Sequence, residues 1–517
     1  MLDSINYDPS VHGFEGPVNV SYSQYVFNQT ANLFTALNEL GIPMAPDPNS
    51  GDVAGASFMP VDIDPINQTR CSARTAYYDP YSSRPNLWIS TGQTVTQILF
   101  EGFSGNANST APVSGDSSVG QGNPSNTGNY FGNASSPINT VHRKLELRNA
   151  GRGKMWMAVK RWLGLPTRQT TPSAPNTGLR AIGVEFAPDS SSSRRNVSAT
   201  REVIISAGAI HSPQLLKLSG VGPAEELQSL QIPVAVDLPG VGTNLQDHYL
   251  VSVSYPYQNQ SYMTSSRVAA NATLMNQAEA EYYASRTGPW TSGPPDGDAF
   301  PPLLAITNGS SAIVDAASTQ SATTFLVNNS DSTVTTGFNA QRQLLVNALR
   351  NSSRAAYELL NTNYGSFSVA NMRPFSRGTI TLKSSNPFQP PLIDPRYGSN
   401  PVDLEVLLAA ILFNRQILAT EAMQILQPKQ LVPTLSADND TIMGIIRKGI
   451  QTEYHPSCSC PMLPLSMGGV VDPNLLVYGT QNLRVVDASI MPMIPASHLQ
   501  AVMYGIAEKV SRNQKCF

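Results

Sequence analysis

Short stretches in which apolar residues alternate with polar ones predict β-strands on both sides of a long polar segment. Before this segment they are residues 86–90 and 94–100, and after it residues 183–186 and 202–206. Residues 104–137, between the two pairs, consist mainly of Gly, Asn and Ser and contain almost no large apolar side chain. Such a composition cannot supply a hydrophobic core. We therefore expect a flexible insertion that interrupts a single sheet-forming unit.

Helical spacing follows the last of these strands and returns later in the chain. Ser212 and Pro213 have the residue types of an N-cap and a first helical position, and the predicted helix continues to Leu218. Residues 403–418 have the apolar spacing of an amphipathic helix, and residues 377–382 read as a strand after a turn. The pattern thus mixes strands and helices throughout the chain.

Two further segments have a pattern without a clear chemical meaning. Residues 154–163 are basic and apolar with helical spacing, and they extend the predicted insertion to about residues 104–175. They indicate either an inserted helix packed on its host domain or a helix that binds a membrane surface or a partner. The packed helix is favoured, because one short segment binds a membrane only weakly. Residues 255–360 are polar and helix-permissive, with no signature of chemistry.

Composition limits the class of protein. The chain has 517 residues, of which 41% are hydrophobic and 13% charged, and its net charge is −3. These values are typical of a globular enzyme of several domains and give no reason to expect a nucleic-acid partner. No stretch reaches the roughly 18 apolar residues of a membrane span. The sequence carries no signal for an oligomeric state.

Cysteines and glycosylation sequences add little. Four cysteines, two of them in a C-x-C arrangement, are too few for a disulfide framework or a zinc site, so thiols without a functional role and no metal site are expected. Asn-x-Ser/Thr sequences occur along the chain, for example at Asn19, Asn196 and Asn439, and fit either a secretory glycoprotein or chance in a chain rich in these residues. The first residues show no signal peptide, so the localisation stays open.

Two histidines near the C-terminus are the strongest candidates for chemistry. His455 and His498 each lie at an expected junction between a loop and a regular element, where a side chain can be held rigidly and still face a cleft. Between them, residues 483–492 read as a strand that ends in a turn, the position at which open α/β sheets bind cofactors. Taken alone, either histidine is more often a structural residue than a catalytic one.

Longer motifs surround these histidines. Residues 208–222 resemble, over their whole length, the second sequence signature of the glucose-methanol-choline (GMC) family of flavoprotein oxidoreductases. Further stretches are similar to the C-terminal catalytic module of that family, or fit other parts of it. They are residues 454–456, 467–472, 483–489 and 507–509 for the module, and residues 84–87 and 244–248 elsewhere. The resemblance implies FAD as the cofactor and a small-molecule alcohol as the substrate.

The resemblance also implies roles for individual residues. In the family a histidine paired with a second histidine or an asparagine faces the flavin beside the alcohol, and His455 and His498 match these two positions. Hydride leaves a carbinol carbon readily only as the hydroxyl proton is taken, so a neutral imidazole is needed within hydrogen-bond reach. By resemblance, His498 is assigned as the base and His455 as its partner. His211 and His248 lie in matching motifs away from these positions, and structural roles are expected for them.

Six residues match family positions near the cofactor. Asp487 and Ala488 are expected near the flavin and its pyrophosphate. Leu499, Gln500 and Ala501 are expected beside the pyrimidine edge of the flavin, where a helix N-terminus favours negative charge, and Val95 is expected beside the adenine through its backbone. The alternative for each residue is ordinary packing in a strand or helix.

The expected fold class is α/β plus α+β. We expect an incomplete FAD-binding, Rossmann-like domain interleaved with a substrate domain built on an antiparallel sheet with helices. The boundaries inferred from the motifs are residues 1–90 for a substrate-side region, 91–250 for the FAD-binding part with its insertion, 251–475 for the substrate domain and 476–517 for the return to the FAD-binding domain.

One family motif has no match in the sequence. Family members open with a strand, a G-x-G-x-x-G turn and a helix that hold the flavin pyrophosphate. We therefore expect an N-terminally truncated member that binds FAD poorly, either an incomplete product or gene model of an active enzyme or a truncated relative without redox activity. The favoured function is the oxidation of an alcohol, with secondary metabolism as the candidate setting. The alternative is a non-redox cyclase or lyase activity. No aromatic cage or carboxylate clamp for a cationic substrate is visible in the sequence.

Overall fold

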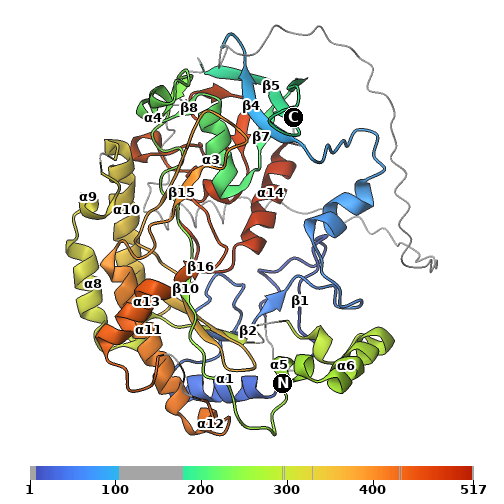
Figure 1. The fold of residues 1–517 in the computed structure, drawn as a ribbon, viewed down its shortest axis with the longest axis vertical. Helices are drawn as coiled ribbons and strands as arrows, with labels where there is room; N and C mark the ends of the chain where they lie inside the picture. Colours follow the sequence, from blue (N-terminus) through green and yellow to red (C-terminus); the bar gives the residue numbers. More distant parts are fainter. Residues whose placement is uncertain are drawn as a thin grey trace. The chain divides into compact units, whose positions relative to one another are not determined.

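A six-stranded antiparallel sheet is the largest β-structure of the described residues (Figure 1). The computed structural model describes residues 7–103 and 178–514, apart from residues 294, 296, 329, 430 and 432. All pairings within this sheet are antiparallel. In spatial order its strands are β16 (Ile450–Thr452), β10 (Tyr249–Val251), β13 (Phe367–Asn371), β12 (Tyr357–Asn361), β11 (Gly297–Phe300) and β2 (Gly55–Phe58).

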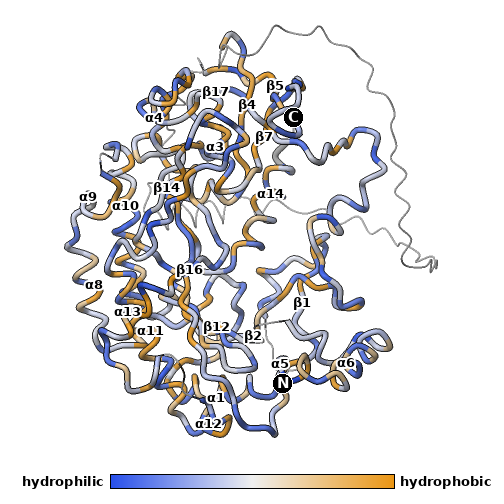
Figure 2. The backbone as a smooth tube through the Cα atoms, viewed as in Figure 1, coloured by the Kyte–Doolittle hydropathy of each residue, from blue (hydrophilic) through white to orange (hydrophobic). Residues whose placement is uncertain are grey.

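One long helix, α11 (Pro401–Ala419), packs against this sheet. It begins after Asn400, whose side chain accepts a hydrogen bond from the backbone N–H of Val402, and Pro401 occupies the first turn. Its apolar residues are buried around most of the helix, and Figure 2 shows hydrophobic stretches in α11 and the adjacent strands. The helix predicted at residues 403–418 is confirmed, with the start two residues earlier.

Other helices complete the packing around the sheet and the loops that leave it. Most of them share one hydrophobic core with α11 and the sheet. None of the described helices has both the length and the apolar character needed to cross a membrane. The helices are α1 (Gln29–Glu39), α5 (Ser265–Ala270), α6 (Ala272–Ser285), α7 (Leu303–Ile306), α8 (Ser310–Thr319), α9 (Ala322–Phe325), α10 (Ser332–Leu349), α12 (Glu421–Gln424) and α13 (Asn439–Gly449).

A second sheet joins the two ends of the predicted insertion. β4 (Thr94–Phe100) pairs antiparallel with β5 (Leu179–Ala187), and β6 (Arg195–Ser198) and β17 (Thr480–Gln481) also pair with β5. The expectation that one sheet-forming unit surrounds the insertion is therefore confirmed. The predicted insertion itself, with the helix expected at residues 154–163, lies outside the described residues.

Short parallel pairs lie beside this sheet. β7 (Val203–Ile205) pairs with β18 (Leu483–Val485), and β8 (Val221–Gly222) pairs with β9 (Val236–Asp237). The strands predicted at residues 202–206 and at the start of residues 483–492 are thus confirmed, and the structure shows that they are direct neighbours. Parallel pairs together with a large antiparallel sheet agree with the expected α/β plus α+β class. The remaining strands are β1 (Ser21–Tyr22), β3 (Pro60–Val61), β14 (Thr379–Thr381) and β15 (Leu392–Asp394).

The strand predicted at residues 86–90 is wrong. This segment forms no β-structure, and it exposes Leu87, Trp88 and Ile89, the tryptophan to 83%. The residue types favour a strand, but a strand also needs a hydrogen-bonding partner, and no described segment pairs with this one.

The start of the helix predicted after Ser212 is also wrong. α3 runs over Gly208–Leu218, so Ser212 and Pro213 lie inside it. Proline cannot donate to the carbonyl of residue 209, four positions earlier. The hydroxyl of Ser459 donates to that carbonyl of Ala209 instead, at 2.5 Å. A contact from a distant loop therefore allows proline within the helix, which local sequence rules could not anticipate.

Candidate active site

The structure brings the two candidate histidines together. The ring centroids of His455 and His498 lie 5.5 Å apart with an angle of 41° between the planes. The side chain of His455 is 18% exposed and that of His498 is 34% exposed. The two rings are thus adjacent and both are open to solvent on part of their surface, as a pair acting on one substrate requires.

A buried carboxyl group holds the loop that carries His455. Asp247 accepts a hydrogen bond from the backbone N–H of His455 at 3.0 Å, and from the hydroxyls of Thr452 and Tyr397, each at 2.5 Å. Tyr454, directly before His455, has a φ of 63°, in a region that residues other than glycine rarely adopt. The contacts to Asp247 stabilise this unfavourable backbone conformation and so position the imidazole.

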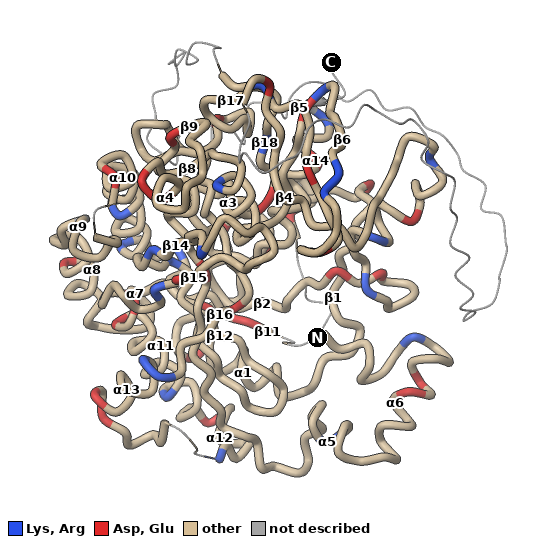
Figure 3. Tube along the Cα trace, turned by 45° about the horizontal axis from the view of Figure 1, so that its top comes forward, with Lys and Arg blue, Asp and Glu red and all other residues tan. Residues whose placement is uncertain are grey.

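His498 lies against acidic side chains of the six-stranded sheet. Its Nε2 lies 2.9 Å from Oε1 of Glu358 in β12 and 3.8 Å from Oε1 of Glu453. Asp298, in the neighbouring strand β11, also belongs to this cluster. Figure 3 shows acidic positions on β11 and β12. Asp298 and Glu358 are almost fully buried. The sequence analysis did not predict this carboxyl cluster.

The acidic groups do not all carry charge. Burial, together with repulsion from Glu358, raises the pKa of Glu453 to about 10 and holds the pKa of Asp298 well above its ordinary value. Burial and the neighbouring Glu358 thus favour the protonated form of Glu453. Of these three groups, Glu358 is the one within hydrogen-bond distance of His498, at 2.9 Å. The spacing of Asp298, Glu358 and His498 would also suit a divalent cation.

The two imidazoles differ in protonation. Burial alone would lower the pKa of His498, but the carboxylate of Glu358 outweighs this effect and raises the pKa to about 9. Burial and the nearby His498 lower the pKa of His455 to about 4. At neutral pH, His498 therefore carries a positive charge and His455 is neutral. These pKa values favour His455 as the proton acceptor, opposite to the roles assigned from the sequence.

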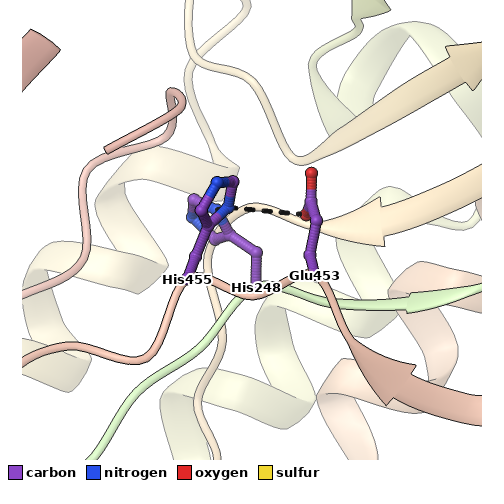
Figure 4. Close-up of side chains that lie close together, drawn as sticks. All are labelled: His248, Glu453 and His455. Carbon is purple, nitrogen blue, oxygen red and sulfur yellow. Dashed lines mark hydrogen bonds and ion pairs between the residues drawn. The ribbon is translucent and has the colours of Figure 1, made fainter. Parts of the chain in front are cut away.

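A third imidazole lies behind His455 (Figure 4). Nδ1 of His248 is 3.1 Å from Nδ1 of His455, and the ring centroids lie 5.2 Å apart at an angle of 88°. On the other side, Nδ1 of His455 is 4.0 Å from Oε2 of Glu453. Nδ1 of His455 thus faces the protein interior, and Nε2 is the nitrogen left for a substrate.

The sequence contained weak signals for the residues it missed. Glu453 stands two positions before His455, and Glu358 and Asp298 are charged residues within the largely buried strands β12 and β11. An acidic residue in a buried strand usually needs a partner or a proton, which points to a functional region. His248 was expected to be structural, yet it contacts the imidazole of His455.

The described residues offer a place for FAD. Gly208, at the start of α3, has a φ of 79° and no atom within 4 Å of the position of a Cβ. In α14 (Gln500–Gln514) no described side chain is buried, Ala501 is exposed, and space is open beside Gly505. Open backbone at two helix N-termini, whose first N–H groups lack partners within the helix, suits an anionic dinucleotide. These features fit FAD.

The residues expected near the cofactor have different environments. The carboxylate of Asp487 accepts hydrogen bonds from the backbone N–H of Gly208 and from Ser212 and Ser489, so it joins β18 to α3. Ala488 follows in a short 3-10 helix, Ala488–Ile490.

The other expected contacts are more exposed, with one exception. Leu499 is buried in an apolar cluster, which leaves its backbone to meet a ligand, whereas Gln500 and Ala501 are exposed at the start of α14. Val95 is 40% exposed on β4. His211 contacts Gln214 within α3, as a structural residue does. The roles of all these residues toward FAD stay predictions.

A cavity of about 330 Å³ lies next to the loop that carries His455. Its lining includes Asp247, Thr452, Tyr454 and Pro456, but neither His455 nor His498. It therefore borders the back of the loop, away from the imidazole pair.

Two regions of the chain match models of one protein family. Residues 159–250 match the N-terminal GMC oxidoreductase model, and residues 374–507 match the C-terminal one. The GMC oxidoreductase family protein Mala s 12 of Malassezia sympodialis is 30% identical over 508 residues, which cover 98% of this chain and 68% of that protein.

Solved structures show the same similarity. An FAD-dependent oxidoreductase from Chaetomium thermophilum aligns with a TM-score of 0.82 and 28% identity over 99% of this chain and 76% of that one. A fungal aryl-alcohol oxidase aligns with a TM-score of 0.78 and 27% identity, over 99% of this chain and 75% of that one. The fold, the two family models and the relative of 30% identity agree, and the chain belongs to the GMC family of FAD-dependent oxidoreductases.

Proposed function

We propose that the protein oxidises a primary or secondary alcohol, with His455 as the base and His498 as the group that binds the alcohol oxygen. The observation that carries this proposal is the pairing of a neutral and a protonated imidazole whose ring centroids lie 5.5 Å apart. A fungal aryl-alcohol oxidase among the similar structures supports an alcohol substrate.

The chain supplies the proton chemistry. Nε2 of His455 accepts the hydroxyl proton of the substrate, because its Nδ1 is directed toward His248 and Glu453. His498 uses Nε2 to contact Glu358. Its protonated ring also carries a hydrogen on Nδ1, which donates to the alcohol oxygen and stabilises the developing alkoxide. Bound FAD supplies the acceptor for the hydride that leaves the carbinol carbon.

The positions expected to hold FAD are part of the proposal. We infer that the backbones of Val95, Ala488, Leu499, Gln500 and Ala501 contact the cofactor. Asp487 would act by fixing the start of α3, since its carboxylate already accepts from Gly208 and Ser212.

The test is reduction of the flavin by alcohols without oxygen. The purified protein is first examined for its flavin content, and a panel of benzylic, aliphatic and secondary alcohols is then mixed with the flavin-loaded protein. We expect loss of the oxidised flavin absorbance with at least one alcohol. Conversion of a substrate with no change in absorbance would support the non-redox cyclase or lyase instead. No flavin binding and no conversion would support an inactive relative.

A second measurement addresses the electron acceptor. Production of hydrogen peroxide in air, at the rate of alcohol oxidation, identifies an oxidase. Turnover that requires an added quinone or dye identifies a dehydrogenase.

A further inference from the structure

His248 is a fully buried imidazole whose only described side-chain hydrogen bond is to the proposed base. It follows Asp247, at the start of β10, and its exposed fraction is 0%. Its Nδ1 lies 3.1 Å from Nδ1 of His455, a distance at which one nitrogen must donate a hydrogen to the other. Figure 4 shows the two rings together beside Glu453.

The number of hydrogens on these two rings is limited. Burial lowers the pKa of His248 well below its usual value, and the pKa of His455 is lowered to about 4, so both rings are neutral near neutral pH. Each ring then carries one hydrogen. If His455 donates from Nδ1, its Nε2 has a free lone pair and can accept a proton. If His248 donates instead, the hydrogen of His455 lies on Nε2, and His455 cannot act as a base there.

The proposed role of His455 distinguishes the two arrangements. Nδ1 of His248 faces Nδ1 of His455 at 3.1 Å, and the buried Nε2 of His248 has no hydrogen-bond partner among the described residues. A base at Nε2 of His455 needs a lone pair there, so the single hydrogen of His455 must lie on Nδ1. His248 is then the acceptor of that hydrogen and carries its own hydrogen on Nε2.

We propose that His248 is a positioning residue that accepts the Nδ1 hydrogen of His455, fixes the tautomer of that ring and leaves its Nε2 lone pair free for the substrate hydroxyl. The inference deepens the proposed function and depends on it for the role of His455. His248 and Asp247 then position His455 together. The carboxyl group of Asp247 accepts a hydrogen bond from the backbone N–H of His455 at 3.0 Å, and Nδ1 of His248 accepts one from the ring of His455.

The charged surroundings of His248 support its role as an acceptor. The titratable and charged groups near His248 are His455 and His498 from the C-terminal loops, Arg373, which follows β13, and Glu453, which has a carboxyl oxygen within 4.8 Å of a nitrogen of His248. A positive charge on His455, His498 or Arg373 opposes a positive charge on the ring of His248. His248 therefore does not take the proton away from His455. It accepts a hydrogen bond throughout the reaction and preserves the neutral Nδ1–H form of His455 between turnovers.

The first experiment measures the tautomers directly. The full-length protein, loaded with FAD and labelled with ¹⁵N in its histidine rings, is examined by NMR, in which protonated and unprotonated ring nitrogens have distinct shifts. The sequence has six histidines, so single substitutions assign the signals. We expect the hydrogen of His455 on Nδ1 and that of His248 on Nε2. A hydrogen on Nε2 of His455 in the unsubstituted protein would overturn the proposal.

The second experiment compares two substitutions. His248→Asn keeps an acceptor near the position of Nδ1, whereas His248→Leu removes it with a similar side-chain volume. We expect alcohol-driven flavin reduction to slow by about 10- to 100-fold in the leucine variant, with little change in KM, and to stay within a few-fold of the original rate in the asparagine variant. His12→Asn, at a histidine that pairs with Asp47, is the control and should change neither property.

The outcomes separate this proposal from the proposed function. Equal rates in the two His248 variants, with both folded by circular dichroism, would contradict a role for the acceptor. If the leucine variant does not fold, the NMR signals of the unsubstituted protein still decide the tautomer. The expected tautomers without any alcohol oxidation would support the assignment of His248 and count against the proposed function alone.

Discussion

The two sides of the imidazole pair differ in what lies behind each ring. Behind His498 the six-stranded sheet places Glu358 at 2.9 Å, and an acidic cluster keeps that ring protonated. Behind His455 lies the neutral ring of His248, and no hydrogen-bonded carboxylate reaches the imidazole of His455 among the described residues. The same side-chain type therefore has opposite protonation at neighbouring positions. The buried partner of each ring therefore determines which histidine can take a proton and which can stabilise negative charge.

The largest effect on the rate of flavin reduction is expected from removal of the neutral imidazole of His455. His455→Ala should slow alcohol-driven flavin reduction by about 10²- to 10⁴-fold, because a positioned general base contributes that much. Stopped-flow absorbance measures the rate, and the flavin spectrum before mixing checks that FAD is still bound. His498→Ala is the comparison and should lose less. A smaller loss in His455→Ala than in His498→Ala would restore the roles assigned from the sequence.

A smaller effect is expected from the carboxylate behind the charged ring. Glu358→Gln removes the charge that raises the pKa of His498, so His498 becomes neutral near neutral pH. We expect the rate to fall by about 10-fold, because a charged hydrogen bond to the alkoxide is replaced by a neutral one. In the unsubstituted protein the rate should decline as the pH rises through about 9, where His498 loses its proton, and this decline should move to lower pH in the variant. An unchanged pH profile would contradict the pairing.

Stability should depend on the same pair. The pKa of His498 is about 9 in the folded protein and about 6.5 in an unfolded chain. Because the pKa of His498 is raised in the folded protein, its protonated ring contributes its whole stabilising free energy below about pH 6.5. This contribution is lost as the pH rises through about 9. Because the side chain is 34% exposed, solvent reduces the effect, and we expect a fall in Tm of the order of a few °C. Thermal unfolding between pH 7 and pH 10 measures it, and Glu358→Gln should lack this part of the pH dependence.

The smallest effect on the rate is expected from substitution of Glu453, the protonated carboxylic acid. Glu453→Gln replaces a neutral carboxylic acid by an amide of the same shape, which can still donate a hydrogen bond to Glu358. The rate near neutral pH should stay within about threefold of the original, a smaller change than the roughly 10-fold effect of Glu358→Gln. The matched pair of Glu→Gln substitutions thus tests which carboxyl group carries the charge. A larger loss from Glu453→Gln than from Glu358→Gln would reverse that assignment.

Local sequence patterns were sufficient where a segment makes its own structure. The apolar spacing of residues 403–418 identified α11, and the alternation at residues 94–100 and 183–186 identified β4 and part of β5. They failed where a distant contact decides. Residues 86–90 find no strand to pair with, and Pro213 lies within α3 because Ser459 satisfies the carbonyl of Ala209.

The amino-acid sequence alone determined the family motifs, the fold class and the two candidate histidines, because these are recorded in residue types and short spacings. Only the tertiary structure decided what lies behind each ring. Glu358 comes from β12 and His248 from the start of β10, and they are 140 and 207 positions away from the histidines they contact. Protonation depends on burial and on neighbouring charges in space, so no order of residues along the chain could assign the proton.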